Sequence, residues 1–160
     1  MAERNGGAAN DVYSLLLPLN GNRRLLLPNA AIVEVIGHTA IDPVKDGPAW
    51  QAGMVAWGDR RLPVISFEAA DGDALPPPNP RARVAILYNI DESLDEDYLA
   101  LVVQGHPHLV KVERGLLQQG REEPGVDSPV LCRVRIGTTE AIIPDLDFLA
   151  RLVAEEQEQE

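Results

Sequence analysis

Short apolar runs separated by turn residues recur along the chain. Val12–Leu19 and Arg24–Leu27 flank Asn20-Gly21-Asn22, which predicts a β-hairpin because Asn and Gly tolerate the positive φ angles of a tight turn. Ala31–Gly37 is rich in β-branched residues, and Leu62–Phe67 has the same character. Both are therefore predicted strands.

The second half of the chain continues with short strands. We predict strands over Val84–Asn89, Tyr98–Gln104, Leu109–Glu113, Val130–Ile136 and Glu140–Ile143, and a short helical turn near Arg114–Gln119. Within 130–136, Cys132 and Val134 alternate with Arg133 and Arg135. This period of two indicates one buried face and one solvated face.

A helix is predicted after the last strand, over 145–156. Pro144 ends the strand, and Asp145 or Asp147 is placed to cap the helix. Its apolar residues recur at helical spacing, at Phe148, Leu149, Leu152 and Val153. The helix is therefore expected to pack one face on the strands.

A proline-rich segment divides the chain into two halves. Asp71–Pro80 reads DGDALPPPNP, and its prolines remove backbone donors, so it is a predicted loop. Many short strands at near-regular spacing indicate a mainly β protein built of antiparallel barrels or a sandwich. We predict one domain over 12–153, with barrels at about 12–70 and 81–144. Residues 1–11 are a predicted flexible arm, and 157–160 a predicted acidic tail.

Composition narrows the classes of partner. The chain of 160 residues carries 25 acidic and 14 basic residues, a formal net charge of −11. Such a surface repels phosphate backbones and anionic lipid heads, so we expect protein partners, no nucleic acid and no membrane insertion. No apolar stretch approaches the length of a membrane span, and the single Cys132 fits a reducing compartment. A cytoplasmic protein is predicted.

Candidate catalytic and metal-binding residues are few. Cys132 lies on the predicted buried face of a strand, where a packed, inert thiol is expected. His106 and His108 are separated by Pro107, and His38 lies elsewhere, so zinc-ligand spacing is absent. No phosphate-binding glycine loop or nucleophile elbow is present. We predict no catalytic residues, no metal and no cofactor.

The landmarks in order resemble the CheW family of chemotaxis coupling proteins over about residues 12–153. The first half runs YSLLLPLNGNRRLLLPNAAIVEVI and GPAWQAGMVAWGDRRLPVISFE, and the second contains RVAILYNI, YLALVVQGHPHLVKV and VRIGTTEAIIPDLDFLARL. Pro48–Gly53 matches the family's P-x-[aromatic]-x-x-G segment, and Leu62–Ile65 matches its P-[VI]-[VI] strand. Within the family, the acidic chain with Trp57 looks most like the adaptors of type IV pilus chemosensory systems, the PilI or ChpC type.

The resemblance implies two small SH3-like antiparallel β-barrels, a C-terminal helix and a non-catalytic adaptor. Its implied partners are the CheA-like regulatory domain of a histidine kinase, the cytoplasmic tip of a chemoreceptor, and other CheW-like proteins. Such an adaptor would serve a chemotaxis or twitching-motility array. Two alternatives stay open: a modulatory paralogue that binds the kinase but not receptors, and a small β-barrel that is an enzyme or binds a small ligand.

The resemblance also implies where partners bind. Ile32 and Glu34 align with positions that face the receptor, and Val35 lies on the same strand. The predicted Met54–Asp59 turn supplies the next candidates, Met54, Trp57, Gly58 and Asp59, with Arg60 directly after it. The family typically has Asn-Leu-Arg-Gly where this chain has Ala56–Asp59, so Gly58 replaces the arginine implicated in receptor contact. Arg60 or Arg61 is a substitute for it by position.

Packing is the competing interpretation for several of these residues. Ile32 and Val35 fit a core position as well as a contact position, because β-branched residues on strands usually pack. Trp50 is expected in the core, whereas Trp57, next to Gly58, is expected to be partly exposed.

Overall fold

The computed structural model describes residues 11–37, 41–113, 117–119 and 128–158. The strands are β1 (Asp11–Pro18), β2 (Arg24–Pro28), β3 (Ile32–Gly37), β4 (Ile41–Asp42), β5 (Gln51–Trp57), β6 (Arg60–Ser66), β7 (Arg83–Tyr88), β8 (Tyr98–Val103), β9 (His108–Glu113), β10 (Leu117–Gln119), β11 (Val130–Ile136) and β12 (Thr139–Pro144). The helices are the 3-10 turns η1 (Asn20–Asn22) and η2 (Asn29–Ala31), the short α2 (Phe67–Ala70) and α3 (Leu146–Glu158).

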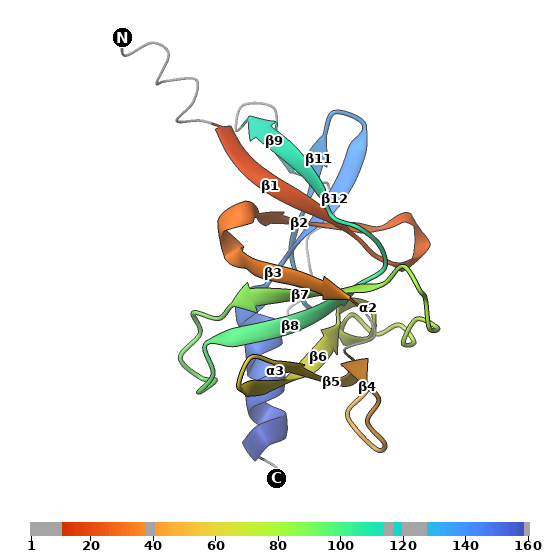
Figure 1. Ribbon diagram of the computed structural model, residues 1–160. Helices are drawn as coiled ribbons and strands as arrows, with labels where there is room; N and C mark the ends of the chain where they lie inside the picture. Colours follow the sequence, from red (N-terminus) through yellow and green to blue (C-terminus); the bar gives the residue numbers. More distant parts are fainter. Residues whose placement is uncertain (1–10, 38–40, 114–116, 120–127, 159–160) are drawn as a thin grey trace.

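The strands form two six-stranded sheets (Figure 1). Sheet A has the order β10-β11-β12-β2-β1-β9, and sheet B has the order β3-β7-β8-β6-β5-β4. Most neighbours are antiparallel, with β12–β2 and β6–β8 the parallel pairs. The prediction of a mainly β fold with a C-terminal helix is confirmed.

The strand pairing corrects the predicted boundaries of the two β units. Sheet A takes β1 and β2 from the first half of the chain and β9–β12 from the second, while sheet B is built from β3–β8. Division into barrels at 12–70 and 81–144 is therefore wrong. The proline-rich segment lies inside sheet B's part of the chain, because β6 pairs with β8 across it. Long-range pairing, and not the loop, decides which strands belong together.

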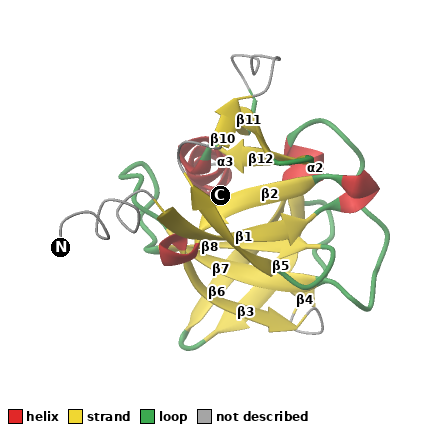
Figure 2. Cartoon of the chain, turned by 90° about the horizontal axis from the view of Figure 1, so that it is seen from above, coloured by secondary structure: helices red, strands yellow, loops and turns green. Residues whose placement is uncertain are grey.

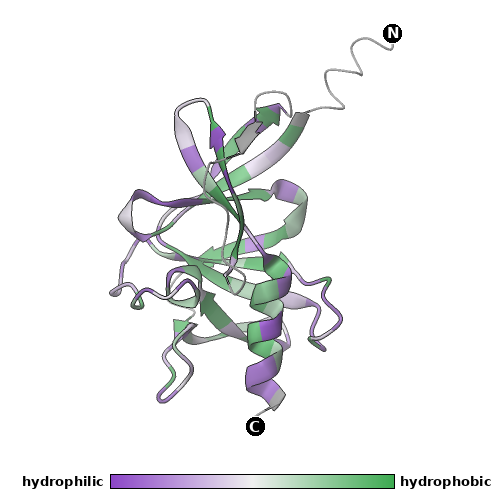
Figure 3. Cartoon of the chain, turned by 180° about the vertical axis from the view of Figure 1, so that it is seen from behind, coloured by the Kyte–Doolittle hydropathy of each residue, from purple (hydrophilic) through white to green (hydrophobic). Residues whose placement is uncertain are grey.

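Both faces are buried in the central strands of each sheet, β1 and β2 in sheet A and β6–β8 in sheet B. In β1 and β2, Leu17 and Leu25 join an apolar cluster shared by both sheets, while Leu16 and Leu26 fill the interior of sheet A. In β7, β8 and β6 the same alternation separates residues of the shared cluster from those inside sheet B. Two-sided burial explains the continuous apolar runs of these strands. Figure 3 shows apolar positions gathered along them.

Helix α3 contributes apolar residues to the shared cluster, and Figure 2 shows the helix nearly end-on beside the strands. The Asp145 carboxylate accepts a hydrogen bond from the Phe148 N–H at 3.1 Å, as an N-cap should. Leu149, Ala150 and Val153 are buried in the shared cluster. The first turns of α3 are mainly apolar and the last turns polar (Figure 3), so packing holds the helix at its start.

Four predicted segments differ from the structure. Residues Met54–Trp57 belong to strand β5 rather than to a turn, because only Gly58 and Asp59 reverse the chain. Leu117–Gln119 pairs with β11 as a strand and is no helical turn. The predicted arm lies outside the described residues up to residue 10, while Asp11 begins β1. The predicted acidic tail begins inside α3, and residues 159–160 lie outside the description.

The proline-rich segment is a loop, as predicted. Asn79 fixes its end by donating to the Gln104 backbone carbonyl at 2.9 Å and accepting from the Arg81 N–H at 2.9 Å. The loop borders a hollow of about 240 Å³ on sheet B, lined mainly by Pro, Ile, Leu, Ala and Val side chains.

A buried carboxylate joins the two sheets at the hairpin end. Glu68, in α2 after β6, is 1% exposed. Its Oε2 accepts the backbone N–H of Asn20 in η1 at 2.8 Å, and its Oε1 accepts the Ser66 hydroxyl at 3.4 Å. The Arg23–Asp73 ion pair at 2.9 Å lies beside it. The turn between β1 and β2 is thereby tied to sheet B.

Cys132 is half-buried on the inner face of sheet A, packed against the cluster that contains Val134 and Ala141. The predicted buried face of β11 is therefore confirmed at Val134, while Leu131 and Arg135 are exposed. Burial raises the pKa of the Cys132 thiol, which disfavours the reactive thiolate.

None of the described helices is long and apolar enough to span a membrane.

Replacing Glu68 with alanine should lower the free energy of unfolding by about 2 kcal/mol, because the Asn20 N–H loses a charged acceptor. Glu68→Gln, which keeps one carbonyl oxygen, should cost clearly less. Urea unfolding followed by circular dichroism measures both. Glu155→Ala, at an exposed position of α3, is the matched control and should change stability by less than about 0.5 kcal/mol. Equal stability of Glu68→Ala and the control would contradict this role.

Alkylation of Cys132 should be slow in the folded protein. The raised pKa leaves a smaller thiolate fraction at a given pH, and the thiolate is the reacting form. Iodoacetamide rates measured from pH 7 to 10 should show a higher midpoint for the native chain than for the chain in urea. A native midpoint at or below the unfolded one would contradict the inert assignment.

Candidate functional site

The β5–β6 hairpin presents a polar and aromatic edge of sheet B. Trp57 and Arg60 are directly opposite each other across the two-residue turn Gly58-Asp59. Gly58 has φ +60° and open space around it, a conformation that L side chains rarely adopt. An arginine at position 58 would therefore meet no steric clash but would strain the backbone of this turn.

Trp57 connects β5 to the far edge of sheet B. Its indole N–H donates to Glu34 Oε1 at 2.9 Å, across a separation of 23 residues. Glu34 lies on β3, the edge strand at the opposite end of the strand order from β4 and β5. The hydrogen bond thus brings two strands together that do not pair through their backbones.

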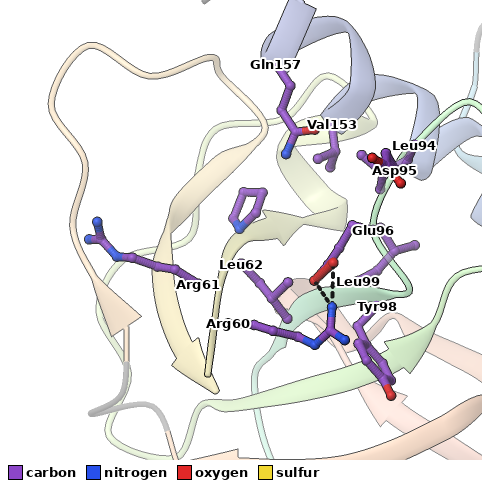
Figure 4. Close-up of a pocket in the computed structure, with 11 residues that line it drawn as sticks. Arg60, Arg61, Leu62, Leu94, Asp95, Glu96, Tyr98, Leu99, Val153 and Gln157 are labelled. Atoms are coloured by element: carbon purple, nitrogen blue, oxygen red, sulfur yellow. Dashed lines mark hydrogen bonds and ion pairs between the residues drawn. The ribbon is translucent and has the colours of Figure 1, made fainter. Parts of the chain in front are cut away.

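Arg60 is held by an aromatic ring and a carboxylate (Figure 4). Its guanidinium lies 4.8 Å from the centre of the Tyr98 ring, and its Nη1 contacts Glu96 Oε2 at 2.7 Å and Oε1 at 3.1 Å. The Tyr98 ring also contacts Trp57 edge-on, at 4.8 Å between centroids. The hydrogen bond to Glu96 raises the pKa of Arg60, so the guanidinium stays charged. These groups, with Glu34, form what we call the Trp57 cluster.

A hollow of about 260 Å³ lies beside the Trp57 cluster. It is bordered by Arg60 and Arg61 on β6, by Asp95 and Glu96 in the β7–β8 loop, and by α3 (Figure 4). A smaller hollow of about 110 Å³ shares the Arg61 side and the end of α3. Both are open to solvent, and the larger is mainly polar, unlike the enclosed apolar pockets that hold small ligands.

The structure brings together five of the eight predicted partner-binding residues. Glu34, Trp57, Gly58, Asp59 and Arg60 share the edge formed by the hairpin turn and β3. The other three are separated from it. Ile32 and Val35 pack against the shared apolar cluster and are only partly exposed, and Met54 contacts the Gln51 amide and borders the smaller hollow.

Three residues of this surface were missed by the sequence reasoning. Glu96 and Tyr98 complete the Trp57 cluster, and Tyr88 lies 6.0 Å from Tyr98 between ring centroids. The sequence held one signal for the two tyrosines. Aromatic residues are only 4% of the chain, and Tyr88 and Tyr98 lie at the two ends of the acidic segment between two predicted strands. Their meeting with Trp57 depends on the β5–β6–β8 arrangement.

The predicted fates of the tryptophans and histidines can be compared with the structure. Trp50 is buried in the shared cluster and Trp57 is partly exposed, so both expectations are confirmed. His106 and His108 are exposed, and the His106 ring contacts Arg83 at 3.1 Å. His38 lies outside the described residues. No group of three or more metal-ligating side chains occurs among the residues that are described.

The surface is suited to binding a polypeptide. Partly exposed Trp and Tyr rings and a charged Arg are groups that are enriched at protein interfaces. The ion pair and the indole hydrogen bond hold these side chains in place before a partner arrives, which lowers the entropy cost of binding.

One family model matches most of the chain, and a solved structure shares its fold. The model of the CheW-like domain matches residues 14–151. Among solved structures, the scaffolding protein TtCheW from Thermoanaerobacter tengcongensis has a similar fold, with a TM-score of 0.70, 16% sequence identity and 86% of each chain covered. Among curated proteins no sequence match is found. Because the family match spans most of the chain, the protein belongs to the CheW-like domain family.

Proposed function

We propose that this protein is a signalling adaptor that couples chemoreceptors to a histidine kinase in a chemosensory array. The observation that carries the proposal is the family match over residues 14–151. A CheW-like scaffolding domain is non-catalytic, so the chain is not an enzyme. Its proposed partners are the CheA-like regulatory domain of a kinase, the cytoplasmic tip of a receptor and other CheW-like proteins, all in the cytoplasm.

The Trp57 cluster is the proposed receptor-facing surface. Glu34 and Trp57 are joined by a hydrogen bond, and the turn at Gly58 and Asp59 is exposed beside them. Ile32, Val35 and Met54 remain in the proposal as partly exposed neighbours, whose burial limits them to a supporting contact. Preorganised aromatic and charged anchors of this kind favour specific binding.

A modulatory adaptor that binds the kinase but not receptors is the second candidate. Gly58 stands where the family typically has arginine, and the neighbouring Arg60 is engaged by Glu96 at 2.7 Å. A receptor carboxylate would have to displace Glu96 to reach this guanidinium. Arg61 is more exposed, and its contact with Asp42 is long at 3.9 Å, so it is the freer substitute for the missing arginine.

We further propose that the array is of the type IV pilus kind, which drives twitching motility. Two features support this finer assignment, because both resemble adaptors of the PilI or ChpC type. One is the acidic composition of the chain, with a net charge of −11, and the other is Trp57 in the segment after Gly53. Genomic neighbours of the encoding gene test it: pilus genes beside the kinase gene would support it, and flagellar genes would oppose it.

Binding of the full chain to the kinase regulatory domain and to a receptor-tip fragment, each measured by calorimetry, tests the adaptor role. Trp57→Ala and Glu34→Lys should each weaken receptor binding by about tenfold or more, because each removes or reverses an anchor of the Trp57 cluster. Kinase binding should stay unchanged. Glu113→Lys, an exposed charge reversal on sheet A, is the matched control and should bind the receptor fragment normally.

The outcomes separate the two candidates. Kinase binding without receptor binding would favour the modulatory adaptor. Binding to neither partner by a chain that melts cooperatively would leave the fold without the proposed function. Receptor binding that tolerates both Trp57→Ala and Glu34→Lys would contradict the proposed surface while leaving the coupling role intact.

A further inference from the structure

The hollow of about 240 Å³ on sheet B differs in chemistry from the two hollows beside the Trp57 cluster. It is bordered by β4 and β5, by the ends of β6 and β8, and by the proline-rich segment, and we call it the sheet B hollow. Charged residues make up 24% of the chain, yet none of the described residues that line this hollow is charged. The other two hollows are lined by Arg61 and by acidic side chains. An occupant of the sheet B hollow therefore meets no ionic partner.

The base of the sheet B hollow is apolar. Ala82 and Val102, each 6% exposed, belong to the apolar cluster inside sheet B, and Ala52 packs against that cluster. The small side chains at 52 and 82 leave space that larger ones would fill. Ser66 is the buried polar residue of the lining, and its hydroxyl accepts the Ala69 N–H at 3.2 Å and donates to a carboxylate at 3.4 Å. The base therefore requires no hydrogen bond from a ligand.

The rim of the sheet B hollow is held in place before any ligand arrives. Three consecutive prolines, 76–78, fix their own φ angles. The Asn79 amide donates to the Gln104 backbone carbonyl at 2.9 Å and to its side-chain oxygen at 3.3 Å, and the Gln104 N–H donates to the Pro18 carbonyl at 2.8 Å. Leu75, on this rim, is 45% exposed. A ligand would cover apolar surface here without the cost of ordering the loop.

We propose that the sheet B hollow binds a neutral, apolar small molecule of the size of one or two aromatic rings. An apolar cavity of about 150 Å³ holds one benzene molecule, so the larger volume of this hollow suits a slightly larger ligand. The uncharged lining selects against ions, because a charged group would lose water without gaining a partner. The hollow is open to solvent on one side, so part of the ligand stays exposed and the affinity is low.

This site is separate from the proposed receptor surface. In the antiparallel pair β7–β8, Tyr88 lies opposite Tyr98 at the end near the Trp57 cluster, and Arg83 lies opposite Val103 at the other end. The sheet B hollow is at that other end, where Ala82 and Val102 line it. The inference therefore goes beyond the proposed adaptor function and does not depend on it.

Titration of the isotope-labelled full chain with benzyl alcohol, benzoate and benzylammonium, followed by heteronuclear NMR, tests the proposal. The three probes share one ring and differ in charge. Benzyl alcohol should bind saturably with a Kd of about 1 mM, and the largest shifts should be at the backbone amides of Ala82, Val102 and Gln104. Benzoate and benzylammonium should bind at least about tenfold more weakly.

Variants of the lining locate the binding. Ala52→Leu, which fills the hollow, should abolish the binding of benzyl alcohol, and Ala56→Leu, at an exposed position of the same strand, is the matched control and should bind as the wild type does. Leu75→Asp lies on the exposed rim, where folding tolerates it. It should weaken benzyl alcohol about threefold by removing apolar contact and strengthen benzylammonium about threefold by supplying an ionic partner.

The contrary results are distinct. Shifts that do not saturate, that scatter over the surface or that are equal for the three probes would overturn the site, and so would binding that survives both Ala52→Leu and Leu75→Asp. Displacement of bound benzyl alcohol by the receptor-tip fragment or the kinase regulatory domain would overturn the choice of a small molecule, because a protein side chain would then occupy the hollow. Failure of the chain to bind either fragment, with benzyl alcohol still bound, would overturn the adaptor function alone.

Discussion

Burial of one apolar layer between two sheets is the constraint on which the rest of this structure depends. Leu17 and Leu25 from sheet A meet Leu101 from sheet B and Phe67 of α2 in this layer, and Leu149 of α3 closes it. All five are fully buried, each side chain worth about 1.5–3 kcal/mol on burial. Neither sheet could expose this face to water, so the two sheets and the helix fold as one unit.

The shared layer also decides where partners can bind. Strands that bury both faces offer few side chains to a partner, so the exposed groups lie mainly at turns and on edge strands. The Trp57 cluster is of this kind, at the β5–β6 turn, and the sheet B hollow lies where β6 and β8 end. Both are held in place by polar contacts, Arg60 with Glu96 and Asn79 with Gln104.

A scaffolding domain needs exposed side chains that are held in fixed positions, and it does not need a reactive group. The ionisable side chains of the Trp57 cluster are paired with each other, and Cys132 is held in the thiol form by burial. Affinity would come instead from a few exposed anchors on a body that does not rearrange. The pairing of Arg60 with Glu96 has a further consequence, since any outside carboxylate would have to compete with Glu96 for this guanidinium.

The sequence by itself determined the local elements and the family. Local patterns specify the elements through contacts a few residues apart: alternating apolar positions specify the strands, Asn20-Gly21-Asn22 the hairpin and the Asp145 cap the helix. The ordered landmarks identify the CheW-like domain. Only the tertiary structure decided which strands share a sheet, because β1–β2 pairs with β9 and β12 from the far end of the chain. It also decided that Trp57 meets Glu34 and Tyr98 while Ile32 and Val35 turn to the core. Such contacts depend on register and on which face of a strand is buried, and no local pattern fixes either.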